Sequence, residues 1–245
     1  MAMTWMVALT AAGFLASVTT NAIGVGGGLL VMPLLALWFP ARQVVSYSTP
    51  MFLANALITL VNYRKHWKVP RTLWTIPWVL IGILIGVHFL VVVSGRGLDI
   101  LIAAIALTFV SYEVYRRASG RQMSGISSWL SLPIGVLAGA VSALSNIGGT
   151  LLSLYVLSPE VTPAGFIGSL ALLYVMMTGA KFGLFWFHHL LGWQALVWSL
   201  PSIPAIMLGA WAGKTLNRLI RPSIFRPLVV GVILLSSVLL LVTPG

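Results

Sequence analysis

Five apolar runs of close to 20 residues constrain the fold of this chain more than any other feature. They lie at about 71–92, 98–115, 163–184, 193–213 and 222–243, and each approaches the length that an α-helix needs to cross a bilayer core. The longest polar connection, 116–128, is about a dozen residues long. No sizeable water-soluble domain fits beside the spans, so we expect any function to lie within a helical membrane bundle.

The charge pattern predicts how the bundle is oriented. The net charge is +11, yet only 7% of the residues are charged and 59% are hydrophobic. The basic residues lie in short loops that flank the spans, chiefly 64–71, 116–121 and 214–226. This is the positive-inside pattern, which predicts that these loops are cytoplasmic and argues against nucleic-acid binding. Cysteine is absent, which excludes disulfides and thiolate chemistry.

The two halves of the chain resemble one another at an offset of about 122 residues. "GFLASVTTNAIGVGGGLL" from Gly13 aligns with "GVLAGAVSALSNIGGTLL" from Gly135, and "IGILIG" at 81–86 aligns with "LGAWAG" at 208–213. The basic loop at 64–71 corresponds to "HHLLGW" at 188–193, which contains no Lys or Arg. Equivalent loops are therefore expected on opposite sides of the membrane, which makes the repeat inverted.

These observations predict an all-α polytopic membrane protein with two inverted repeats, 1–122 and 123–245, in one integral membrane domain. Inversion requires an odd number of crossings in each half. We therefore expect each half to contain a glycine-broken hairpin followed by three full spans. The hairpin helices are predicted at about 4–21 with 27–39, and at about 127–144 with 149–158.

The glycine-rich breaks are the candidate substrate site. Non-helical backbone at membrane depth is tolerated where it lines a cavity, and a helix that begins there presents free N–H groups to an anion. Polar residues accompany both breaks. The predicted binding residues at the breaks are Asn21, Gly26, Gly27, Gly28, Ser145, Asn146, Gly148, Gly149 and Thr150. The alternative is that the glycines only let helices pack closely.

Lys181 is the one lysine or arginine well inside a predicted span. An intramembrane cation is a functional hypothesis, here as the counter-charge of an anion or as a proton carrier. The alternative is that its side chain snorkels to the interface. His88 and Glu113 are weaker candidates for proton coupling. No metal site is expected, because the histidines lack ligand spacing and carboxylates are few.

The segments "NAIGVGGGLLVMPLLAL" at 21–37 and "LSNIGGTLLSLYVL" at 144–157, together with the duplication, the length and the basic loops, resemble the TauE/SafE family of sulfite and organosulfonate exporters. The resemblance covers essentially the whole chain. It implies a secondary transporter of the inner membrane that moves small anions such as sulfite or sulfoacetate and is coupled to protons. "SYSTPMFLAN" at 46–55 loosely resembles the family's polar element and adds Asn55 to the candidate binding residues.

The leading hypothesis is thus a multi-pass inner-membrane transporter, with the resemblance favouring an exporter, whose partners are a small anion and the lipid bilayer. An anion channel or an importer is a close alternative. An integral-membrane enzyme is disfavoured, because three scattered acids and no cysteine offer little catalytic machinery. A structural subunit without transport is also open, and so is a homodimer. No cofactor is expected.

Overall fold

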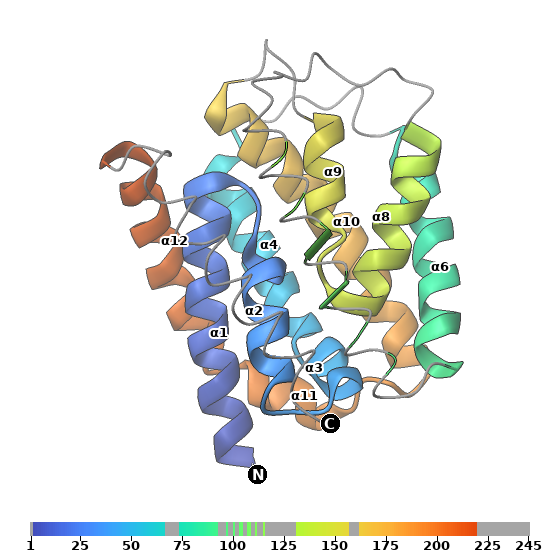
Figure 1. The fold of residues 1–245 in the computed structure, drawn as a ribbon. Coiled ribbons are helices and arrows are strands. Elements are labelled where there is room, and N and C mark those ends of the chain that lie inside the picture. Colours follow the sequence, from blue (N-terminus) through green and yellow to red (C-terminus); the bar gives the residue numbers. More distant parts are fainter. Residues whose placement is uncertain are drawn as a thin grey trace.

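The computed structural model describes residues 2–66, 74–92, 97, 100, 103–104, 107–108, 111, 115, 131–156 and 162–219. Within these ranges the regular structure is entirely helical (Figure 1), which confirms the all-α part of the predicted fold class. Three helical runs there are long and apolar enough to cross a membrane. They are α1 (Ala2–Ile23), the consecutive helices α3 (Ala41–Tyr47) and α4 (Thr49–Tyr63), and α10 (Pro163–Phe187).

α11 (Trp193–Ser199) and α12 (Ser202–Leu219) meet at a bend of 47°, and together they are long and apolar enough for either a broken span or a re-entrant loop. The apolar run predicted at 193–213 therefore consists of two helices. Pro201 stands at the bend, where it removes a backbone N–H and restricts the residue before it. The first hairpin helix was also underestimated, because α1 has 22 residues and a length of about 33 Å.

Both predicted glycine breaks are present. The first separates α1 from α2 (Gly27–Ala36), and the second separates α8 (Ser131–Ser145) from α9 (Gly149–Val156). α6 (Ile76–Val92) completes the helices of the described residues. The predicted span at 222–243 and most of that at 98–115 lie outside the described residues, so the expected number of full spans in each half stays a prediction.

Helices at equivalent places in the two halves run in opposite directions. In Figure 1, α1 and α4 run upward, whereas α8 and α10 run downward. The two most extensive helix interfaces are also reciprocal, since α1 packs on α12 and α6 packs on α8. Each interface therefore joins the first helix of one half to a late helix of the other.

Glycines make both of these interfaces close. A Cβ atom at Gly82 of α6 would lie 2.0 Å from the carbonyl oxygen of Val136 in α8. Likewise, a Cβ atom at Gly209 of α12 would lie 2.6 Å from the carbonyl oxygen of Phe14 in α1. Gly82 and Gly209 occupy the same place in "IGILIG" and "LGAWAG". Close backbone approach through small residues is a usual way for membrane helices to associate.

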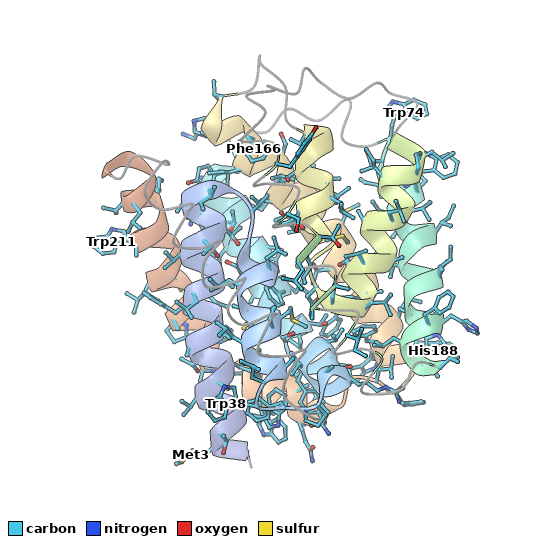
Figure 2. The ribbon with its side chains drawn as sticks, in the orientation of Figure 1. Met3, Trp38, Trp74, Phe166, His188 and Trp211 are labelled. Carbon is cyan, nitrogen blue, oxygen red and sulfur yellow. The ribbon has the colours of Figure 1, made fainter. Side chains whose placement is uncertain are left out.

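The residues at the two ends of the bundle are of the kinds found at membrane interfaces. Figure 2 shows Trp38 and His188 at the end opposite Trp74. Tryptophans near span ends are typical of membrane interfaces. Lys214 lies over the ring of Tyr63, 5.9 Å from its centroid, so the basic residues that follow α4 and those near the end of α12 share one end of the bundle. This agrees with their predicted placement on one side of the membrane.

Candidate functional site

A cavity of about 50 Å³ lies where the two glycine breaks meet. A water molecule needs roughly 10–15 Å³ of such volume, so the cavity has room for a few waters or a small anion. α1, α2, α4, α8, α9 and α10 contribute to its walls, together with the second break. The lining residues are Thr20, Gly26, Gly27, Gly28, Leu29, Phe52, Asn55, Ala56, Ser142, Asn146, Ile147, Gly149, Thr150, Tyr174, Met177 and Thr178.

Most of these residues form pairs at the repeat offset of 122. One member of each pair comes from each half, so the walls of the cavity are built twice from the same places in the repeat. The pairs are Thr20 with Ser142, Gly27 with Gly149, Gly28 with Thr150, Phe52 with Tyr174, Asn55 with Met177, and Ala56 with Thr178.

The first break presents backbone amides to the cavity. Gly26 has φ of 102°, a left-handed conformation that favours glycine, and it caps α2 without a side-chain hydrogen bond. Its carbonyl accepts from the N–H of Leu30, which closes the first helical turn. Within the described residues, the N–H groups of Gly27, Gly28 and Leu29 have no hydrogen-bond acceptor. The start of α2 can therefore bind an anion.

The second break offers fewer free amides. The N–H of Thr150 donates to Ile147 O at 3.0 Å, and the N–H of Leu151 donates to Gly148 O at 3.1 Å. The Thr150 hydroxyl also donates to Ile147 O, at 2.5 Å. α9 therefore begins with a tight turn that uses amides which α2 leaves free. The two breaks are equivalent in position but differ in their capacity to bind an anion.

The two breaks touch one another. A Cβ atom at Gly28 would lie 2.2 Å from the carbonyl oxygen of Asn146, so only glycine allows this approach. Asn146 itself has φ of 55°, which asparagine tolerates better than most residues. Tyr174 bridges the breaks, because its hydroxyl lies 3.1 Å from Gly149 O and 3.4 Å from Gly24 O.

Lys181 lies directly behind the wall of the cavity. Its side chain is fully buried, and Nζ donates to Ser142 O at 3.2 Å and to Asn146 Oδ1. Both acceptors belong to residues that line the cavity. The ammonium group thus points into the bundle, and the alternative of snorkelling to the interface is wrong. Lys181 is the one buried basic side chain among the described residues.

Asn146 connects this lysine to the first half of the chain. While Oδ1 accepts from Lys181, Nδ2 donates to Ser48 Oγ at 3.0 Å and to Val45 O at 3.1 Å. Ser48 stands at the junction of α3 and α4. One amide therefore links the second break, α10 and the first half.

Asn55 is an unsatisfied polar group on the opposite wall. It is buried, and its Nδ2 lies 3.4 Å from Thr20 Oγ1, while its Oδ1 has no hydrogen-bond partner in the described structure. A buried amide oxygen without a partner is costly. Rotation of the amide about Cβ–Cγ would let Thr20 donate to Oδ1 and would leave the NH₂ group free to bind a ligand.

Not all of the predicted binding residues reach the cavity. Seven of them line it: Gly26, Gly27, Gly28, Asn55, Asn146, Gly149 and Thr150. Asn21 is instead buried among helices, where Nδ2 donates to Ser17 O at 3.0 Å and to Thr59 Oγ1 at 3.2 Å. Ser145 donates to Val141 O within α8, and Gly148 packs against α8, with Ala138 O 1.9 Å from a Cβ built there.

The two candidates for proton coupling lie away from this cavity or outside the described residues. His88 is an exposed residue of α6 and does not line the cavity. Glu113 lies outside the part of the chain that the structure describes. The described residues also contain no group of three or more side chains that could hold a metal ion.

Phe52, Tyr174 and Thr178 line the cavity without having been predicted to do so. Phe52 and Tyr174 stand at equivalent repeat positions, and that pairing was the signal that could have identified them. Their chemistry could not, because an aromatic residue inside an apolar span is more typical of packing than of a site.

One family of known proteins matches this chain over most of its length. A family model described as sulfite exporter TauE/SafE matches residues 9–240, nearly the whole chain. No curated protein and no solved structure matches the chain.

Proposed function

The chain belongs to the sulfite exporter TauE/SafE family, and we propose on this premise that it is a secondary transporter that exports a small sulfur-containing anion. The family consists of membrane transporters rather than enzymes. The proposed location is the inner membrane, with several crossings. The proposed substrates are sulfite, sulfoacetate or a related sulfonate, and the export direction rests on the family alone.

The observation that carries this proposal is a cavity whose walls come in equivalent pairs from the two halves. We propose that residues 1–122 and 123–245 form inverted repeats. The opposite helix directions and the reciprocal interfaces of α1 with α12 and of α6 with α8 support this assignment. In such transporters the substrate binds between the repeats, and rocking of one against the other exposes the site to each side in turn.

Two features of the cavity favour an anion. The N-terminus of α2 presents free amides, and Lys181 places a basic group behind Asn146. An ammonium group in a membrane interior needs a compensating charge, and a bound anion supplies it.

Proton coupling is part of the proposal, with His88, Glu113 or the substrate itself as the carrier. The exposed position of His88 favours the substrate over that residue. An anion channel or an importer would use the same cavity. These alternatives differ in kinetics and direction, which flux measurements separate.

The test is the release of labelled sulfite from proteoliposomes that contain the full chain. We expect flux that saturates with concentration and is accelerated by sulfite on the opposite side. Ala56→Leu should abolish it, because Ala56 lines the cavity and is 3% exposed. Leu57→Phe is the matched control, because this neighbouring side chain is 45% exposed and is not among the lining residues.

Flux that rises linearly without saturation would replace the transporter with a channel. The absence of both flux and binding across sulfite, sulfonates, carboxylates and sulfate would remove the anion site altogether. Equal loss in A56L and L57F would show that the cavity has no special part in transport.

A further inference from the structure

The charge around the cavity indicates how many negative charges the substrate carries, in addition to the sign of that charge. Lys181 supplies one positive charge when its amine is protonated, and its side chain is 0% exposed. The corresponding position in the first half is Thr59, a neutral residue that is also 0% exposed and whose hydroxyl accepts from Asn21 Nδ2 at 3.2 Å. The duplication has therefore placed a cation in only one of two equivalent positions.

The backbone adds less than a second positive charge. A helix N-terminus contributes about half an elementary charge. The amides at the start of α2 are free to supply this, whereas those of Thr150 and Leu151 in α9 are already bonded. Lysine and helix together thus supply roughly one to one and a half positive charges.

The lysine is close enough for its charge to act in the cavity. Met177 and Thr178, the turn of α10 that precedes Lys181, line the cavity. Three residues along a helix correspond to about 4.5 Å. The ammonium group also binds Asn146 Oδ1 and Ser142 O, which belong to two lining residues. The nitrogen of Lys181 is thus one hydrogen bond away from residues that line the cavity.

We propose that this site selects a small monovalent anion, and that the charge of Lys181, held behind Asn146, sets this preference. The inference rests on the proposed anion transport and defines its substrate class. A monovalent anion would neutralise the ammonium group. A divalent anion would bring a second negative charge that the partial charge of α2 only partly compensates, in an interior where unpaired charge is costly. Among the proposed substrates this favours hydrogensulfite or a small monosulfonate over sulfoacetate, which carries both a sulfonate and a carboxylate.

The test compares chlorate with sulfite just above neutral pH, where the sulfite dianion outnumbers hydrogensulfite. The two are pyramidal oxyanions with three oxygens each, so they differ mainly in charge. Binding to the full-length protein in detergent is measured by calorimetry. We expect the Kd of wild-type protein for chlorate to be lower than its Kd for sulfite by about tenfold or more.

Four variants assign this preference to the lysine. Lys181→Met removes the charge, and Asn146→Asp places a carboxylate against it, so both should weaken chlorate binding at least about tenfold. Lys181→Arg keeps the charge and should retain the preference. Gly183→Ala is the matched control on the same helix, because a Cβ atom there meets nothing within 4 Å. Thermal unfolding checks that each variant is folded, and N146D tests the proposal without removing the lysine.

The possible results separate this inference from the proposed function. Equal or tighter binding of sulfite than of chlorate would overturn the monovalent assignment and leave anion transport standing. A chlorate preference that persists in K181M and N146D would reflect easier dehydration of chlorate and would overturn the role of Lys181. Absence of binding and of flux for both anions in wild-type protein would overturn the proposed function itself.

Discussion

Gly28→Ala should separate the two glycine breaks and thereby damage the anion site. The added Cβ atom would lie 2.2 Å from Asn146 O, 3.0 Å from Asn146 C and 3.4 Å from Ile147 Cα. All three atoms belong to the backbone, so no side-chain rotation can relieve the contact. To reach ordinary contact, the distance to Asn146 O must rise by about 1.2 Å, from 2.2 to 3.4 Å.

This displacement is large compared with the tolerance of a hydrogen bond. N–H···O distances in proteins span only about 2.7–3.2 Å, so amides of α2 that move by this amount lose their bonds to a ligand. A hydrogen bond to a charged group contributes about 1.5–3 kcal/mol, and 1.4 kcal/mol corresponds to a factor of ten. Loss of one such bond therefore weakens anion binding by roughly 10–150-fold. Overpacking should also lower the free energy of unfolding by about 1–3 kcal/mol.

The assay combines sulfite and chlorate affinity by calorimetry with thermal unfolding in detergent. Gly183→Ala introduces the same methyl group into α10, where no atom lies within 4 Å, and should change neither quantity. If G28A bound both anions with wild-type affinity and unfolded at the wild-type temperature, the close approach of the two breaks would be refuted as the basis of the site.

Three further substitutions test the framework around the cavity. Gly139→Ala should destabilise the α6–α8 interface by about 1–3 kcal/mol, because the Cβ atom would lie 2.1 Å from Val79 O; Gly179→Ala, with open space around it, is the control in detergent unfolding. Ser17→Ala removes the 2.8 Å bond to Ile206 O between α1 and α12 and should cost about 1 kcal/mol in the same measurement, and no loss would contradict this. Tyr174→Phe removes the hydroxyl that bridges Gly24 and Gly149 and should cost about 0.5–1.5 kcal/mol. It should also weaken sulfite binding measured by calorimetry, and unchanged binding would show that the bridge has no part in the site.

Sequence patterns predicted the positions of the breaks well, because glycine in an apolar run has few structural uses. Gly26 and Gly28 therefore lie in the predicted region and line the cavity. The side-chain register was harder to predict. Asn21 and Ser145 stand next to the breaks in sequence, yet both are hydrogen-bonded within and between helices instead. Which face of a helix meets a cavity depends on packing partners that are distant in sequence.

The bend at Pro201 shows a second limit of hydropathy. An apolar run from 193 to 213 satisfies the length of a span whether or not its helix is continuous. Lys181 shows that sequence position also does not fix the direction of a side chain, since its distance from the span end allowed both snorkelling and burial. Its bonds to Ser142 and Asn146 decide for burial, and these partners lie in another helix and a break far along the chain.

The cavity combines lining residues that are paired between the two halves with a basic residue that only one half supplies, and the two features would serve different steps of the proposed transport. The proposed alternating access needs two halves that can exchange roles, and the paired lining residues, such as Gly27 with Gly149, would supply equivalent positions. Neutralisation of one substrate charge needs a single cation, and a lysine in both halves would leave an excess positive charge in the membrane interior. The two halves differ in two respects that one monovalent anion would require. Thr59 stands at the repeat position that corresponds to Lys181, and the first amides of α9 are hydrogen-bonded where those of α2 are free.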